Sequence, residues 1–280
     1  MKNPSAIKDL SKLCIHTITT KPWDLPTAVE RYAAAGVSGI TVWRDAAANC
    51  PGGIAKAGEL CRDAGLEIVS YVRGGFFTGE TSGERGTAVE QNKRIIDEAQ
   101  ELGAPLVVLV CGATPGISLP DCRRQIRDGI AACVDHAAQA GVRLGIEPLH
   151  PMYADSRSAV NTLSQALDMS LEIESPQVGV TVDVFHLWWD DRLESEIARC
   201  GKEEKLFSFH ICDWKDQPED MLNDRGLMGE GVIDVPAIRG WVEATGFKGY
   251  NEVEIFSNRY WQEDQDEYLA KIISAYRESS

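Results

Sequence analysis

The feature that most constrains the fold of this chain is an alternation of strand-like and helix-like segments through all 280 residues. Apolar runs rich in β-branched residues predict eight strands, at 12–19, 39–43, 66–72, 105–110, 142–147, 178–185, 206–212 and 250–256. Apolar positions at three-to-four spacing predict helices at 25–35, 53–64, 87–102, 119–140, 156–174, 192–201, 235–245 and 262–278. Strands that alternate with helices pair in parallel, because each helix carries the chain back to the start of the next strand.

Eight such units predict an α/β fold, a (β/α)8 TIM barrel that forms one domain over residues 1–280. The length agrees, since such barrels typically occupy about 250 residues. No Pro/Ser-rich linker divides the chain. A doubly wound sheet is the alternative, but no G-x-G-x-x-G motif follows an early strand, which weakens that alternative.

Composition narrows the kind of partner. The 43 acidic and 28 basic residues leave a formal charge of −15, which argues against binding to nucleic acid. No apolar run approaches the roughly 20 residues that span a bilayer, and the first residues lack a signal-peptide core. The eight cysteines contain no C-x-x-C pair and predict free buried thiols. We therefore expect a cytoplasmic protein that acts on a small molecule; a homo-oligomer or association with a second subunit stays open.

The connection after the seventh predicted strand is unusually long. Residues 213–234 are rich in charge and glycine, and they are too many for an ordinary turn between a strand and its helix. Long connections of this kind often carry function. The sequence predicts an ordered lid over the mouth of the barrel.

The sixth predicted strand carries an isolated charge. Side chains alternate between the two faces of a strand, so the valines at 178, 180, 182 and 184 share one face and Asp183 lies on the other. The valines suit the layer that faces the helices, which points Asp183 toward the barrel axis. A buried carboxylate is costly unless something pairs with it.

The same alternation points Glu147, His210 and Glu254 inward near the ends of their strands, and it points Phe207 outward. Three carboxylates and an imidazole in one closed interior repel unless a cation joins them. Oxygen-rich ligation with one nitrogen suits Mn²⁺, Mg²⁺ or Co²⁺ and is also compatible with Zn²⁺. The alternative for any single carboxylate is an ion pair with a core arginine such as Arg143.

Several motifs resemble those of the xylose isomerase-like barrel superfamily, which includes ketose 3-epimerases, hydroxypyruvate isomerases, inosose dehydratases and endonuclease IV. They are GVRLGIEPLH at 141–150, VTVDVFH at 180–186, FHICDW at 209–214, GEGVID at 229–234 and GFKGYNEVE at 246–254. The resemblance rests on the order E…D-x-x-H…H…E at successive strand ends, and it covers the C-terminal half specifically. It implies that a divalent metal, Mn²⁺ first, is held by Glu147, Asp183, His210 and Glu254.

Further residues are candidates for the substrate side. The resemblance implies this role for His186, three residues after the aspartate, and for Arg225 in the long loop. His150 follows E-P-L, where relatives often carry a non-ionisable residue, so it is either a proton-transfer group or a hydrogen-bonded loop histidine. His16 and Trp43 end the first and second strands and are candidate substrate contacts, with core packing as the alternative for the tryptophan.

These residues predict a metal-dependent sugar isomerase or epimerase. The metal would polarise a carbonyl, and the neighbouring carbon would lose a proton to give an enediolate. For an epimerase, the resemblance implies that Glu147 and Glu254 act on opposite faces, one as base and the other as acid. The alternative is a lyase on a keto-sugar, an inosose-type dehydratase or a 3-keto-glycoside-eliminating deglycosidase, with His150 protonating the leaving group.

Two further classes are weaker. An endonuclease IV-like nuclease would need more histidine ligands and a basic face, and a noncatalytic metal-binding protein would show no proton exchange on a substrate. Arg44 and Arg73 end strands, but no glycine-rich phosphate cradle accompanies them. We therefore expect a sugar or keto-sugar rather than a sugar phosphate.

Overall fold

A closed barrel of eight parallel strands forms the centre of the computed structural model, which describes residue 7 and residues 9–280. Residues 1–6 and 8 of the predicted domain lie outside the described part. Neighbouring strands follow the order of the chain, and β8 closes the ring against β1. The strands are β1 (Leu13–His16), β2 (Gly39–Trp43), β3 (Glu67–Gly75), β4 (Leu106–Val110), β5 (Arg143–Glu147), β6 (Val178–Asp183), β7 (Leu206–Ile211) and β8 (Asn251–Val253). The fold is the predicted TIM barrel.

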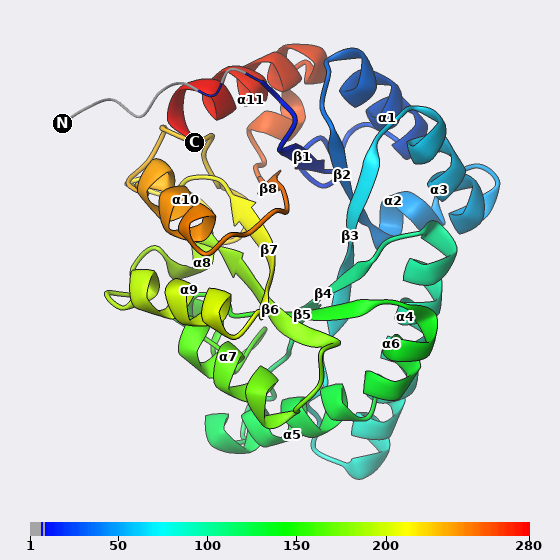
Figure 1. The fold of residues 1–280 in the computed structure, drawn as a ribbon, viewed down its shortest axis with the longest axis vertical. Helices are drawn as coiled ribbons and strands as arrows, with labels where there is room; N and C mark the ends of the chain where they lie inside the picture. Colours follow the sequence, from blue (N-terminus) through cyan, green and yellow to red (C-terminus); the bar gives the residue numbers. More distant parts are fainter. Residues whose placement is uncertain (1–6, 8) are drawn as a thin grey trace.

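Helices surround the strands (Figure 1). They are α1 (Leu25–Ala34), α2 (Arg44–Ala48), α3 (Gly53–Asp63), α4 (Ser82–Leu102), α5 (Leu119–Ala131), α6 (Val134–Ala140), α7 (Leu163–Glu172), α8 (Val184–Leu187), α9 (Leu193–Lys202), α10 (Val235–Ala244) and α11 (Gln265–Ser279). Two short 3-10 helices, η1 (Pro151–Tyr153) and η2 (Tyr260–Gln262), lie in loops. No helix in the described part is both long enough and apolar enough to cross a bilayer.

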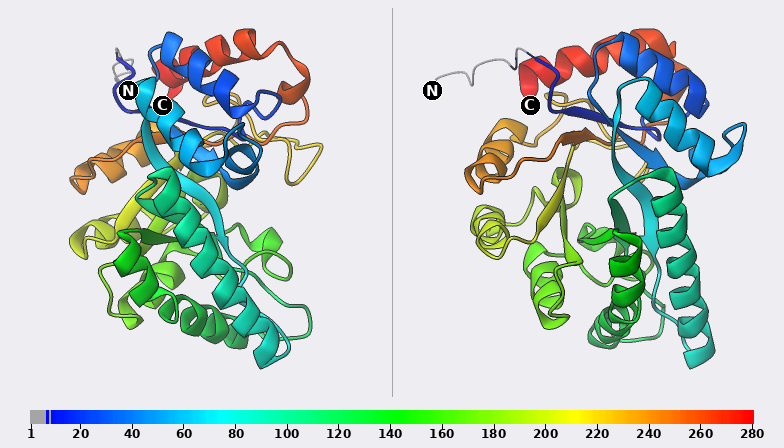
Figure 2. Two further views of the ribbon diagram at one scale, coloured as in Figure 1. Left: turned by 90° about the vertical axis from the view of Figure 1, so that its right-hand side faces the viewer. Right: turned by 45° about the vertical axis from the view of Figure 1, so that its right-hand side comes forward.

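The last helix, α11, packs beside the first helix, α1, where the barrel closes. α11 lies beside α1 in both sets of views (Figures 1 and 2), and Arg31 of α1 pairs with Asp266 of α11 at 3.4 Å. In the barrel wall, β1 and β8 are neighbouring parallel strands, and Cys14 lies opposite Glu252 in their register. Barrel closure therefore brings the first strand against the last, which the site depends on.

Alternation along the strands separates two regions of packing. The outer core holds the side chains that face the helices, including Val180, Ile146 and Val253. A smaller apolar cluster of Val72, Leu106 and Val108 faces the barrel axis, together with Phe207.

The outward prediction for Phe207 is wrong. The pairing of β6 with β7 shifts between Val180 and Thr181, where Val180 opposes Leu206 and Thr181 opposes Ser208. Phe207 is the extra residue of this bulge, and its side chain turns into the barrel. Ser208 and His210 keep the inward positions that alternation predicts.

Several helix boundaries also differ from the prediction. The helix expected at 119–140 is two helices, because after Ala131 the hydrogen bonds tighten and the Cys133 amide donates to Ile130. The helix expected at 156–174 begins at Leu163, since the side chain of Thr162 caps the amide of Gln165. The helix expected at 87–102 begins at Ser82, and the short helices α2 and α8 were not predicted.

The cysteine prediction is confirmed. All eight thiols are free and buried. They pack as small apolar side chains.

Gly75 is a position where β3 accepts no side chain. Its φ is +112°, and an added Cβ would lie 1.9 Å from the carbonyl oxygen of Val110. We expect Gly75→Ala to lower the free energy of unfolding by about 3 kcal/mol or more, measured by denaturant titration. Gly86→Ala is the control, because Gly86 lies inside α4 with nothing within 4 Å, and it should add about 0.5–1 kcal/mol. Equal effects of the two variants would contradict this account of β3.

Candidate metal centre

Four buried side chains meet at the carboxyl ends of the last four strands. Glu147 ends β5, Asp183 ends β6, His210 lies in β7 and Glu254 follows β8. Each offers one ligand atom, and these atoms all lie within 4.8 Å of one another. The strand register accounts for the convergence, since Asp183 pairs directly with His210. The structure thus brings together the four residues that the alternation pointed inward.

The charges of this cluster are poorly balanced by the protein itself. Burial raises the pKa of Asp183 to about 6, against the opposing effect of Arg225. Burial by itself lowers the pKa of His210, but contacts with Glu147 and nearby carboxylates outweigh it and raise the pKa to about 10. The raised pKa of His210 shows that carboxylates surround this imidazole, whereas the raised pKa of Asp183 is chiefly an effect of burial.

Two ligand atoms also lack ordinary partners. Glu147 Oε1 and His210 Nδ1 lie 3.1 Å apart, both buried, and neither has a hydrogen-bond partner within residues 9–280. Buried polar atoms are rarely left unpaired without a reason. Three carboxylates, one imidazole and two unpaired donor atoms fit a divalent cation with mixed oxygen and nitrogen ligation.

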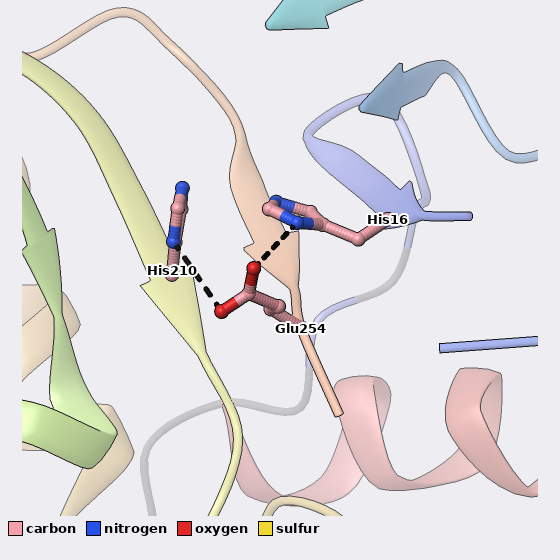
Figure 3. A group of neighbouring side chains, drawn as sticks. All are labelled: His16, His210 and Glu254. Carbon is pink, nitrogen blue, oxygen red and sulfur yellow. Dashed lines mark ion pairs between the residues drawn. The ribbon is translucent and has the colours of Figure 1, made fainter. Parts of the chain in front are cut away.

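His16 lies behind the cluster rather than in front of it. Its Nδ1 is 3.1 Å from Glu254 Oε1, and its Nε2 is 3.3 Å from Glu252 Oε2. Figure 3 shows the Glu254 carboxylate between His16 and His210. His16 is fully buried, so its neighbours are these carboxylates. This placement favours a role for His16 in positioning the carboxylate of Glu254. It gives less support to the substrate contact that was predicted for His16.

Glu252 is a central residue that the sequence analysis did not single out as part of the site. Its carboxylate accepts hydrogen bonds from Ser208 Oγ at 2.5 Å and Thr41 Oγ1 at 2.8 Å. Burial by itself raises the pKa of Glu252, but His16, His210 and Ser208 lower it to about 2. Its inward position two residues before Glu254 was the available signal.

Asp183 and Glu254 also have an arginine partner. Arg225 Nη1 donates to Asp183 Oδ2 at 3.0 Å and to Glu254 Oε2 at 2.9 Å. Its guanidinium lies 4.3 Å from the ring centre of Phe185 and 4.9 Å from that of Phe256. The sequence analysis named Arg143 as a possible ion-pair partner of these carboxylates. That prediction is wrong, because Arg143 lies over the ring of Phe207.

His186 reaches the same cluster because the strand ends early. Asp183 terminates β6, and its carboxylate caps the first turn of α8 by accepting from the amide of Phe185 at 2.8 Å. This turn brings His186 Nε2 to 3.3 Å from Arg225 Nη2. Burial, reinforced by Arg225, lowers the pKa of His186 well below its usual value, so this imidazole is neutral.

A cavity of about 40 Å³ lies over the cluster. Glu147, Glu254, His186, Arg225 and Trp43 line it. His150 does not: its Nδ1 accepts from the amide of Met152 at 3.2 Å, and its ring lies against Trp189 and Trp214. The proton-transfer role predicted for His150 therefore has less geometric support than the roles predicted for the cavity-lining residues.

The long loop is anchored at its ends, and its tip partly covers the cavity. Asp213 accepts hydrogen bonds from four backbone amides, those of Trp214, Gly229, Gly231 and Ile233. Leu222 packs against Val110, Leu149 and Tyr153 at the cavity wall. The hydroxyl of Tyr153 donates to the carbonyl of Met221 at 2.5 Å. The loop thus has an anchored end and a tip that covers the cavity, as a lid requires.

Comparison with known proteins extends these findings. The xylose isomerase-like TIM barrel family matches residues 29–277. The 3-dehydroshikimate dehydratase of Pseudomonas aeruginosa is 30% identical over 240 residues, which are 84% of this chain and 37% of that protein. The inosose isomerase of Bacillus licheniformis is 28% identical over 199 residues, 69% of each chain. This chain therefore spans little more than a third of the dehydratase's length.

Two solved structures share the fold. A protein of Sinorhizobium meliloti 1021 superposes with a TM-score of 0.92 at 45% identity, over 96% of this chain and 98% of its own. The zinc-bound structure of the IOLI protein superposes with a TM-score of 0.82 at 22% identity, over 94% of this chain and 96% of its own. The second likeness is one of fold alone.

The cluster generates a prediction about metal binding. We expect Asp183→Asn and Glu254→Gln each to weaken Mn²⁺ binding by about 100-fold or more, because each removes a charged ligand. At a metal concentration of 100 times the dissociation constant, the wild-type protein should gain about 2.7 kcal/mol of stability. Calorimetric titration and thermal melts measure both quantities. Asp168→Asn, which alters an exposed ion pair with Arg199, should leave both unchanged, and tight binding by both ligand variants would refute the site.

The lid generates a second prediction. Tyr153→Phe removes the hydrogen bond to Met221, which is worth about 1 kcal/mol, so amides of residues 219–223 should exchange with deuterium about fivefold faster. Tyr250→Phe is the matched control. It also removes one tyrosine hydroxyl, which donates to Glu67 at a place outside the loop, just before β8. Unchanged exchange in the loop of Tyr153→Phe would show that this contact does not hold the lid closed.

Proposed function

This chain belongs to the xylose isomerase-like TIM barrel family, and from that premise we propose that it is a divalent-metal-dependent isomerase or epimerase of small sugars or keto-sugars. The observation that carries the proposal is the buried cluster of Glu147, Asp183, His210 and Glu254 beneath a cavity that Leu222 partly covers. The relatives compared above are enzymes, an isomerase and a dehydratase.

The metal would supply Lewis-acid polarisation of a substrate carbonyl, which acidifies the neighbouring carbon. Glu147 and Glu254 both line the cavity, so either carboxylate can take the proton from that carbon while its electron pair moves toward the carbonyl oxygen. In an epimerase the other glutamate, in its acid form, returns a proton to the opposite face. Microscopic reversibility then allows the two residues to exchange roles in the reverse direction.

Other cavity residues would orient the substrate. Arg225 and His186 lie at hydrogen-bonding distance from each other and line the cavity beside Glu254, which suits them to bind substrate hydroxyls. Trp43 offers an apolar wall. The loop tip at Leu222 would exclude water while the proton is on the enzyme.

Mn²⁺ is the metal we propose, because three carboxylates outnumber the single imidazole. Zn²⁺ is the alternative, supported by the zinc-bound neighbour of the same fold. We further propose that the barrel forms one domain over residues 1–280 and works in the cytoplasm, which the eight free thiols support. A homo-oligomer or a second subunit is compatible with this proposal.

A lyase acting on a keto-sugar is the second candidate, and the 30% identity to a dehydratase favours it. Such an enzyme would take the same proton and then expel a leaving group from the next carbon, which needs an acid. The glutamate that has taken the proton can supply it, because Glu147 and Glu254 both line the cavity, whereas His150 lies outside it and the lowered pKa of His186 leaves that imidazole neutral. Product mass separates the two reactions: an isomerase conserves it and a dehydratase loses water.

Solvent exchange tests the shared first step. Metal-loaded enzyme in D₂O should place deuterium on the carbon beside the carbonyl of ketoses or inososes, and Glu147→Gln at saturating metal should slow this by about 10²- to 10⁴-fold. NMR and mass spectrometry measure the exchange. His150→Ala should retain it, because His150 lies outside the cavity. Absence of exchange across a broad panel, with metal bound, would overturn the proposed function.

A further inference from the structure

Two arginines at the cavity have no acidic partner. Arg73 lies in β3, Arg157 lies in the loop between η1 and α7, and both line the cavity over the cluster. Neither takes part in an ion pair with any residue in the described ranges, and the buried Nη1 of Arg73 has no hydrogen-bond partner there.

Both arginines are partly buried, and an unpaired cation at such a position is unusual in a chain with a formal charge of −15. Nearby Arg44 pairs with Glu98 at 2.8 Å, and Arg225 pairs with two carboxylates. Burial lowers the pKa of Arg73, and the neighbouring charge of Arg157 lowers it further. The two guanidiniums repel each other across the cavity, and no carboxylate of the described residues pairs directly with either of them.

The positive charge of Arg73 is compensated, at a longer distance, by carboxylates of the candidate metal site. Glu147 and Glu254 are among the carboxylates whose charge favours the protonated form of Arg73. Both belong to the group that fits a divalent cation, and a bound cation would neutralise them. With the metal in place, the cavity would have a positively charged wall at Arg73 and Arg157, which an anionic ligand group would complement.

The surroundings leave both guanidiniums available. Arg73 lies 4.7 Å from the ring centre of Phe76, and Arg157 lies 5.8 Å from that of Tyr153. Arg73 and Trp43 also line a second cavity of about 200 Å³ next to the first. A ligand larger than the 40 Å³ space over the cluster therefore has room to extend past Arg73.

We propose that the substrate carries a carboxylate and that Arg73 and Arg157 bind it, while its carbonyl end meets the metal cluster. The substrate class is thus a hydroxylated keto acid of sugar size, and this inference rests on the proposed function for the reacting end. Planar guanidinium groups match a carboxylate through paired N–H donors.

A phosphate fits less well, because the adjoining glycine segment has no free amides to cradle it. The amide of Gly75 donates to Asn92 Oδ1 at 2.7 Å, and that of Phe76 donates to the carbonyl of Val110 at 2.8 Å. Phosphate sites on glycine-rich segments depend on such amides. The two side chains are the available donors on this wall.

Paired ligands that differ in one group test the proposal on Mn²⁺-loaded protein. D-fructuronate and D-fructose differ by a carboxylate in place of a hydroxymethyl group, and quinate and its amide differ by one charge. Calorimetry at low salt should show at least one acid binding about tenfold or more tightly than its neutral partner. Arg73→Gln and Arg157→Gln should each remove most of that preference and leave affinity for the neutral ligand unchanged.

Arg143→Gln is the control, since it removes an exposed guanidinium that lies over Phe207 and lines none of these cavities. It should keep the full preference, and thermal melts confirm that each variant folds. No preference for either acid, or a preference that survives both variants, overturns the proposal. Tighter binding of D-fructose 6-phosphate than of D-fructuronate overturns it too, because the subsite would then be a phosphate site.

Deuterium exchange separates this inference from the function on which it rests. Exchange on neutral ketoses without any preference for acids would leave the proposed function standing and remove the carboxylate subsite. A carboxylate preference lost in both arginine variants, with no exchange on any ligand, would retain the subsite and remove the proposed reaction.

Discussion

Four carboxylates buried inside one closed barrel are the constraint on which the rest of the site depends. Glu147, Asp183, Glu252 and Glu254 are all almost fully excluded from solvent, and uncompensated burial of one such charge costs several kcal/mol. Within residues 9–280, Arg225 is the one permanent cation that contacts them directly. The raised pKa of His210 follows from this excess of carboxylates, and a divalent cation at the cluster would offset much of their negative charge.

The buried carboxylates have two kinds of position: three are candidate metal ligands, and Glu252 lies behind them. Glu252 is fixed by hydroxyl groups from β2, β3 and β7, and it holds His16, which in turn holds Glu254. Such contacts behind a ligand set its orientation and basicity. Strand residues therefore fix the four candidate ligands, whereas Arg157 and Arg225 reach the cavity from loops and Arg73 reaches it from β3.

The strand residues were predictable because their side chains have a strict period of two. That period identified Asp183, Glu147, His210 and Glu254 from one sequence. It failed at Phe207, where a single extra residue in β7 changes the face of the side chain without any sign in the sequence. Loop residues have no such period, so nothing in the sequence indicated that Arg157 lines the cavity. The chemistry of His150 suggested a role in proton transfer, but the sequence did not show where its side chain points. Glu252 was visible as an inward residue, but its partners come from strands distant in sequence.

The loop at 213–234 must satisfy two demands that conflict. It supplies Arg225, whose contacts with Asp183 and Glu254 belong to the metal cluster, and it also places Leu222 over the cavity that a substrate must enter. Motion of the whole loop would disturb the ligands at every opening. The backbone resolves this, because Gly226 pairs with Asp213 and the amide of Arg225 donates to Phe256, while the tip is tied to the barrel mouth by Tyr153. The backbone pairing that holds Arg225 on the cluster therefore does not depend on the contact between Leu222 and the cavity wall.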